Sequence, residues 1–247
     1  MKPFNTLLAA SAILALAATA AAAAAQTYGT WNDSSSSSPS WQGGAGSNQS
    51  GPNATGSNII NGQVNLQNNW SNLNGSIDTT GSDATVTGSA AGNLVDITTM
   101  NNTKVQNSQI VGAGASIGSN VNVDVNNVGG NASVSNQVVC NGASVSTDPA
   151  YAATNSLQKC SAADPYSSIN TNISNVSGNV AVQGSSLGNS FEADSNASNM
   201  PVTTKQINNS GVTSNVNTNL YNVGGTATLS SSAIGNTSQI IHYSTSN

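Results

Sequence analysis

The side chains that carry most enzyme chemistry are scarce in this chain of 247 residues. It contains one histidine, two cysteines, nine acidic residues and four lysines, with no arginine. Two carboxylates are the minimum for glycoside hydrolysis, and the candidate pairs are Asp78 with Asp83 and Glu192 with Asp194. These acids lack arginine or aromatic sugar platforms near them. We therefore expect no catalytic residue and classify the chain as a non-enzyme.

The composition also limits the partners. Only 5% of the residues are charged and 4% are aromatic, whereas about a quarter are charged in an average soluble domain. Asn, Ser and Gly dominate instead. Four lysines cannot build a phosphate-neutralising surface or a basic membrane-binding face. We therefore expect no nucleic-acid partner.

Residues 1–25 have the pattern of a secretory signal peptide. Lys2 precedes an apolar run over residues 7–17. Small residues follow, and the alanines at 23–25 form an expected cleavage site before Gln26. The apolar run is shorter than a bilayer span, which favours a cleaved signal over a retained N-terminal anchor, the alternative.

Residues 26–57 are predicted to form a flexible Ser/Gly/Asn-rich leader, because they show neither helical nor strand periodicity. Trp31 and Trp41 lie in this leader. Exposed indoles often contact sugars or a partner surface, so both are candidate ligand contacts. The alternative is that they pack back onto the folded body.

The two cysteines, Cys140 and Cys160, lie in the least regular part of the chain that follows. In a secreted chain such a pair predicts a disulfide, with two free thiols as the alternative. The bond would close a loop of about twenty residues and contribute about 3 kcal/mol. Two sulfurs without a second Cys or His pair cannot fill a tetrahedral shell, so we expect no metal and no cofactor.

Residues 58–247 contain a repeat of one block. Its copies begin at Leu73, Val121, Ile169 and Val216, with spacings of 48, 48 and 47 residues. The four copies read LNGSIDTTGSDATVTGSAAGN, VNVDVNNVGGNASVSNQVVCN, INTNISNVSGNVAVQGSSLGN and VNTNLYNVGGTATLSSSAIGN. Apolar positions, a Gly-containing turn and a closing Asn return in register, which indicates a repeat architecture.

Each block predicts two strands. An alternating strand such as Val121, Val123 and Val125 is followed by a Gly-containing break, where glycine permits positive φ, and then by a second alternating strand. The block closes with an Asn at a second expected corner, since Asn tolerates left-handed backbone. His242 is expected to end the final strand.

The predicted fold is all-β, a β-solenoid of stacked rungs with Asn and Gly at the corners. A propeller blade of 40 to 50 residues is the alternative, and the solenoid unit is either about 24 or about 48 residues long. Stacked Asn side chains hydrogen-bond along the stacking axis and form a ladder. The predicted ladder residues are Asn93, Asn141, Asn189 and Asn236.

The last block shows no polar cap near its end. An uncapped solenoid presents an open β-edge, and such an edge templates pairing with another chain. Low charge gives little repulsion against this stacking. We therefore expect self-association through β-edges.

The pattern small-apolar-Gly-Asn followed by alternating residues occurs at residues 186–189 and 233–236. From about Leu73 to the end, the chain resembles curli-type fibre subunits and the related holdfast-attachment proteins of stalked bacteria. Curli repeats carry Gln at set positions, whereas Gln109, Gln183 and Gln239 are not in strict register here. This departure favours a looser member of the surface-anchor group.

The resemblance implies export through an outer-membrane pore, assembly on the bacterial cell surface, and attachment of the cell or its adhesive polysaccharide to a surface. The expected protein is therefore a secreted adhesin or anchor of the holdfast or biofilm type, which forms amyloid-like fibres. Its expected partners are copies of itself, outer-membrane secretion or anchor proteins, and surface polysaccharide. The alternative function is a monomeric carbohydrate-binding or matrix protein that displays polar rows on a β-helix.

Overall fold

A computed structural model describes residues 57–100, 103–147, 152–196 and 200–243. The predicted signal peptide, the predicted leader up to residue 56, and both Trp31 and Trp41 lie outside these residues.

The described residues are all-β. Twelve strands lie in them, and they form three parallel four-stranded sheets. Sheet A has the order β1-β4-β7-β10, sheet B has β11-β8-β5-β2, and sheet C has β12-β9-β6-β3. The strands are β1 (Ser57–Asn65), β2 (Asn69–Thr80), β3 (Ala84–Thr99), β4 (Thr103–Val111), β5 (Ser116–Val128), β6 (Ala132–Thr147), β7 (Ala152–Cys160), β8 (Ala163–Val176), β9 (Val180–Ser195), β10 (Val202–Asn208), β11 (Thr213–Val223) and β12 (Ala227–His242).

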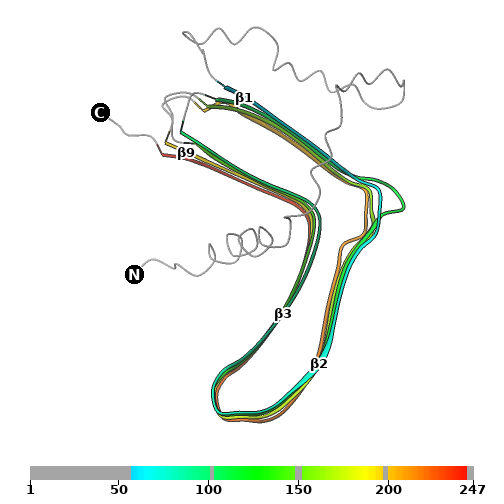
Figure 1. Ribbon diagram of the computed structural model, residues 1–247, viewed down its shortest axis with the longest axis vertical. Helices are drawn as coiled ribbons and strands as arrows, with labels where there is room; N and C mark the ends of the chain where they lie inside the picture. Colours follow the sequence, from blue (N-terminus) through cyan, green and yellow to red (C-terminus); the bar gives the residue numbers. More distant parts are fainter. Residues whose placement is uncertain (1–56, 101–102, 148–151, 197–199, 244–247) are drawn as a thin grey trace.

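Each turn of the chain contributes one strand to each sheet, and successive turns lie directly over one another (Figure 1). We call these turns rungs: rung 1 holds β1 to β3, rung 2 holds β4 to β6, rung 3 holds β7 to β9, and rung 4 holds β10 to β12. This arrangement of stacked parallel sheets is compatible with the predicted β-solenoid.

The strand register agrees with the alignment of the four sequence blocks. Leu73 pairs with Val121, Val121 with Ile169, and Ile169 with Val216. One rung therefore takes one full block of the repeat. The shorter unit of half a block was suggested by the similarity of residues 90–95 to residues 116–123. It is wrong, because these two segments lie in different sheets, in β3 of sheet C and β5 of sheet B. Among the twelve described strands, none pairs with the next strand along the chain, as the strands of a propeller blade would.

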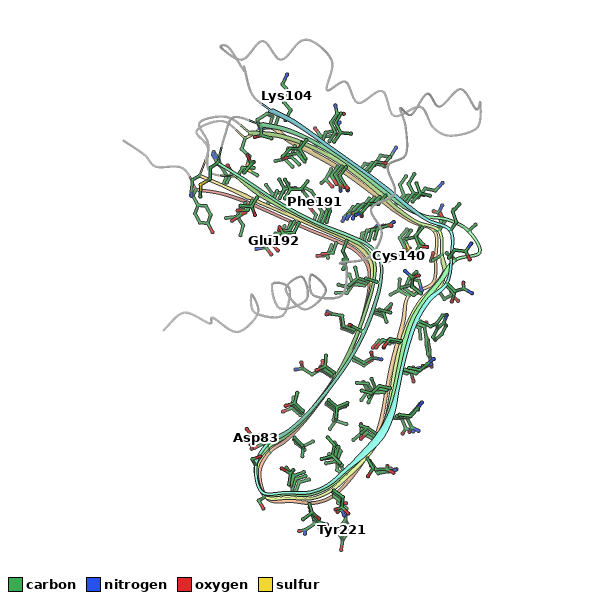
Figure 2. All side chains as sticks on the ribbon, in the orientation of Figure 1. Asp83, Lys104, Cys140, Phe191, Glu192 and Tyr221 are labelled. Atoms are coloured by element: carbon green, nitrogen blue, oxygen red, sulfur yellow. A yellow bond between two sulfur atoms is a disulfide. The ribbon has the colours of Figure 1, made fainter. Side chains whose placement is uncertain are left out.

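The interior lies between the sheets, and its outline bends (Figure 1). Sheets B and C enclose the largest apolar cluster, which contains Val121, Ile169 and Val182. A second cluster lies at the bend, and a third, which contains Phe191, lies near Val105 of β4 and Val145 of β6. In Figure 2 the Phe191 side chain points into the space between the two arms of the chain.

The predicted corner at the closing Asn is a bend within a continuous strand rather than a break. In β6 the even-numbered residues up to Val138 are buried, whereas after Asn141 the buried alternation continues at Ala143, Val145 and Thr147. The residues that face inward therefore switch from even to odd numbers at the bend. Every residue between Val138 and Ala143 is buried. His242 ends β12, as predicted.

The predicted role of the corner glycines, to supply positive φ, is wrong. Among the described residues, positive φ occurs at Gly114 but not at Gly129, Gly130 or Gly178. Positive φ occurs instead at Thr79, Asn127, Asn175 and Asn222, with values of 59°, 55°, 53° and 53°, and at Asp164. The first four occupy the same position in successive rungs, and we call such a set of residues a column. Asn tolerates this backbone because its short polar side chain bonds locally.

The glycines are required by the close approach of neighbouring rungs. A Cβ added at Gly178 would lie 2.7 Å from the Gly130 carbonyl oxygen, and one at Gly129 would lie 2.9 Å from that of Gly81. These contacts are with backbone, which cannot move aside without parting the rungs. The corners therefore need glycine for space and not for backbone rotation.

Replacing Gly178 with Ala should accordingly lower the free energy of unfolding by roughly 1–3 kcal/mol, the usual cost of overpacking. Gly75→Ala is the matched control, because a Cβ at Gly75 meets nothing within 4 Å and should change stability by no more than about 0.5 kcal/mol. Urea denaturation of the two variants compares them. Equal stabilities would contradict the close-approach explanation.

Candidate functional site

The four predicted ladder asparagines lie over one another inside the bend. The Asn93 Nδ2 donates to the Asn141 Oδ1 at 2.9 Å, Asn141 donates to Asn189 at 2.8 Å, and Asn189 donates to Asn236 at 2.7 Å. Asn141 and Asn189 are completely buried. This Asn ladder therefore forms a continuous row of side-chain hydrogen bonds through all four rungs.

Bonds to the backbone determine which way the Asn93 and Asn189 amides face. The Asn93 Nδ2 also donates to the Ile110 carbonyl at 3.0 Å, and the Asn189 Nδ2 donates to the Ile207 carbonyl at 2.8 Å. A flipped amide would place two oxygens in contact at each of these positions. The donor direction of the Asn ladder, from rung 1 towards rung 4, is therefore specified by the surrounding chain.

A second buried ladder is formed by glutamines of sheet A. Gln206 donates to Gln158, Gln158 to Gln109, and Gln109 to Gln63, each at 2.9 Å. This Gln ladder is not among the sequence predictions, which compared Gln109 with two glutamines of sheet C, Gln183 and Gln239. The signal was present, because its four members recur at spacings of 46, 49 and 48 residues.

Each glutamine of this ladder also bridges sheet A to sheet C. In each of them one Nε2 hydrogen is donated to a backbone carbonyl of sheet C at 2.7–2.9 Å. The acceptors are Leu94, Gly142, Ser190 and Thr237. The amide orientation is again determined by the backbone, and the donor direction runs from rung 4 towards rung 1.

Cys140 and Cys160 are joined by a disulfide with a Cα–Cα distance of 6.0 Å. The prediction that both cysteines lie in an irregular segment is wrong, because Cys140 lies in β6 and Cys160 in β7. Both side chains are completely buried, and in Figure 2 Cys140 lies at the bend. The bond therefore links rung 2 covalently to rung 3.

Asp78 and Asp83, one of the two carboxylate pairs predicted as candidates for hydrolysis, accept hydrogen bonds from the neighbouring rung. The Asp78 Oδ1 accepts hydrogen bonds from Asn126 and Asn127, and the Asp83 Oδ1 accepts from the Asn131 amide. Glu192 and Asp194 are two residues apart in β9 and lie on the same face of that strand. Figure 2 shows Glu192 pointing outward. Within the described ranges, no cluster of three or more His, Cys, Asp or Glu could hold a metal ion.

An aromatic pair lies on the outer face of sheet B. The Trp70 and Tyr166 ring centroids are 6.5 Å apart, with planes tilted by 44°. Gly118 lies between them in the column, and a Cβ there would be 2.6–2.8 Å from three atoms of the Trp70 six-membered ring. The indole therefore lies over the Gly118 backbone, and Trp70 remains 47% exposed.

Amide and hydroxyl groups surround this pair. The Asn215 Nδ2 donates to the Tyr166 hydroxyl at 3.3 Å. Side-chain hydrogen bonds with Ser168 and, to a smaller extent, with Asn215 lower the pKa of the Tyr166 phenol below its usual value. Neighbouring columns carry exposed asparagines, such as Asn120, which donates to Asn72 at 3.0 Å. Trp70 is not among the ligand contacts predicted from the sequence, which fall in the leader.

The stack has two end faces. The outermost strands of rung 1 and rung 4 have a neighbour on one side only, within the part of the chain that is described. We call the edges of β1, β2 and β3 the rung 1 face, and those of β10, β11 and β12 the rung 4 face. Among the described residues, no further strand pairs with the outer edge of either face.

Apolar side chains that are buried inside the stack are exposed at the rung 4 face. Leu229, Ile234 and Ile240 are 49%, 40% and 50% exposed. Their column neighbours in rung 3, namely Val182, Leu187 and Ala193, are 0%, 5% and 0% exposed. At the rung 1 face, Leu73 is 37% exposed, although Val121 beneath it is completely buried. Each face therefore exposes apolar side chains that a further rung would cover.

Comparisons of the chain with protein-family models, with curated proteins and with solved structures found no match. Over the described ranges there is no helix of sufficient length and apolarity to cross a membrane.

The two kinds of Asn contact can be compared by mutation. Asn141→Ala should lower the free energy of unfolding by about 2–5 kcal/mol, because it leaves the Asn93 donor and the Asn189 acceptor without buried partners. Asn122 makes a bond of similar length, 2.9 Å to Asn74, but on the exposed face. Asn122→Ala should therefore cost less than about 1 kcal/mol. Denaturant unfolding measures both, and similar losses would contradict a structural role for the buried ladder.

Proposed function

We propose that this chain is a secreted structural protein of the bacterial cell surface, an adhesin or anchor built on a β-solenoid. In this proposal a signal peptide and a flexible leader precede the solenoid. Copies of the chain associate through their end faces into amyloid-like fibres, as in the curli-type and holdfast-attachment proteins that the sequence resembles. Its activity is mechanical and requires no catalytic residue or cofactor.

The observation that carries this proposal is the pair of end faces. A parallel strand edge is a template for a further strand, and natural proteins usually block such edges with charge, proline or a covering segment. Here Leu229, Ile234 and Ile240 add exposed apolar surface to the rung 4 face. The chain also carries little charge, 5% of its residues, to oppose association.

The remaining partners follow from this role. A cell-surface anchor must leave the cell, which requires an outer-membrane secretion pore, and must be held there by an anchor protein. Surface polysaccharide, such as that of a holdfast or a biofilm, is the material that it would attach. The polar outer columns of sheet B, for example Asn74 and Asn122, are suited to hydrogen bonding with hydroxyl groups.

Self-association is tested by sedimentation velocity, electron microscopy and thioflavin fluorescence over a range of protein concentrations. We expect ordered fibres or oligomers that grow with concentration. Leu229→Lys should raise the concentration needed for assembly by roughly tenfold or more, because it places a charge in an apolar contact. Ser230→Lys, on the outward side of the same strand, is the matched control. A wild-type chain that stays monomeric throughout would contradict the proposal.

Carbohydrate binding is a second candidate function, and the Trp70–Tyr166 pair favours it. Sugar rings stack their C–H faces on aromatic rings, and neighbouring amides bond their hydroxyl groups. An exposed indole that lies over Gly118, with Asn72 and Asn120 in an adjacent column, offers both kinds of contact. This site can operate in a monomer or along a fibre.

The binding test is titration with neutral glucan and N-acetylglucosamine oligosaccharides, followed by calorimetry. We expect the wild type to bind one of these classes and Trp70→Ala to lose at least about tenfold in affinity, since an aromatic contact contributes about 1 kcal/mol or more. Tyr221→Ala is the control, because Tyr221 is a 74% exposed aromatic of the same sheet. Equal affinity of both variants would exclude this platform.

A further inference from the structure

The two buried amide ladders run in opposite directions. In the Asn ladder each Nδ2 donates towards rung 4, whereas in the Gln ladder each Nε2 donates towards rung 1. Backbone carbonyls determine the amide orientation in both, at Ile110 for Asn93 and at Thr237 for Gln206, for example. The stack therefore has a polarity that is set by its own hydrogen bonds.

Among the described residues, each end face consequently carries one ladder donor and one ladder acceptor without a partner in a further rung. At the rung 4 face, Asn236 accepts from Asn189 and its Nδ2 has no acceptor in the described chain, while the Gln206 Oε1 has no donor there. At the rung 1 face the situation is reversed. Among the described residues the Asn93 Oδ1 lacks a donor, and Gln63 uses one Nε2 hydrogen for Leu94 and none for a neighbouring rung.

We propose that the chain associates with a second copy of itself head to tail, with the rung 4 face of one copy on the rung 1 face of the next and in register. The Asn236 Nδ2 then donates to the Asn93 Oδ1 of the second copy, and the Gln63 Nε2 of that copy donates to the Gln206 Oε1. Both ladders continue without a break. This inference rests on the self-association proposed above and specifies its direction and its contacts.

The backbone and the apolar columns agree with this direction. The strands β12 and β3 are both 16 residues long, and β11 and β2 have 11 and 12. In-register stacking would place Ile240 over Ile97 and Leu229 over Val86, residues of the same columns inside the stack. Each new contact therefore repeats a contact that the chain already makes between its own rungs.

Contact between two like faces does not reproduce this arrangement. A two-fold axis between two rung 4 faces reverses the sense in which the chain winds, so the strands of the two copies could not all pair parallel and in register, as the strands of the described sheets do. Asn236 would then not lie over an Asn of its own column, and the buried ladders would end at the contact. Unpaired buried amides are costly, which favours the head-to-tail contact.

The direction is tested by blocking one face at a time in the full-length chain, purified in the form that the cell produces. Ile234→Asp blocks the rung 4 face, and Leu73→Asp blocks the rung 1 face. The two side chains are 40% and 37% exposed in the monomer, so circular dichroism should show both variants folded. Sedimentation velocity should find each variant monomeric alone and an equimolar mixture dimeric, with no larger species.

A second variant tests the ladder contact itself. Asn236→Asp keeps the Oδ1 that accepts from Asn189 but removes the donor offered to the next copy and sets a carboxylate against the Asn93 oxygen. Assembly should require a roughly tenfold to hundredfold higher concentration, while the melting temperature of the monomer changes little. Ser230→Asp, with the same charge on the outward side of β12, should assemble like the wild type.

The outcomes separate the two proposals. A wild-type chain that never associates overturns the proposed function and this inference together. A wild type that associates while Leu73→Asp alone still forms dimers shows contact between like faces and overturns only the direction. Folded variants that stay monomeric in the mixture, or an Asn236→Asp chain that assembles normally, also overturn the head-to-tail contact.

Discussion

The structure depends on one constraint: parallel strands that stack in register place each residue directly over its counterpart in the next rung. Neighbouring strands lie about 4.8 Å apart, so every side chain must be compatible with the side chain at the same position of the next rung. Apolar side chains satisfy this condition by packing. Among polar side chains, the amides of Asn and Gln carry a donor and an acceptor in one plane, and so they can bond to an identical neighbour above and below. Hydroxyl groups also donate and accept, as Ser135 does with Thr87 of the neighbouring rung. The unusual composition therefore follows from the stacking.

The buried amides also specify the register. Asn141 and Gln158 are completely buried, and each bonds to the equivalent residue of a neighbouring rung. A slip of one residue would turn these amides away from their partners and leave several buried polar groups unpaired, in addition to moving the apolar side chains out of the core. The two ladders therefore act against the register errors to which long uniform strands are prone. Since their donors run in opposite directions, they also distinguish the two ends of the stack.

In some columns one rung carries a different type of residue from the other rungs, and the neighbouring residues accommodate it. Cys140 takes the place that Gly92, Gly188 and Gly235 hold in the other rungs, and its sulfur bonds to Cys160 rather than occupying space over a neighbouring backbone. Trp70 lies over Gly118 because the missing Cβ leaves room for the ring. Such positions break the symmetry of the stack. They are the positions at which a specific function, such as the proposed sugar contact at Trp70, can be placed without disturbing the columns.

The sequence by itself determined the repeat, its blocks and the Asn column of Asn93, Asn141, Asn189 and Asn236, because residues that recur at a nearly constant spacing leave a direct trace in the chain. It did not determine the rung length, since β3 and β5 share a local pattern although they lie in different sheets. The Gln ladder left the same kind of trace, at spacings of 46, 49 and 48 residues, although it was not among the predictions. The role of Gly178 leaves no such trace, because it depends on how closely the Gly130 backbone of the neighbouring rung approaches. Only the tertiary structure decided which columns face each other across the interior, and hence the direction of each ladder, since amide orientation depends on carbonyls that are distant in the chain.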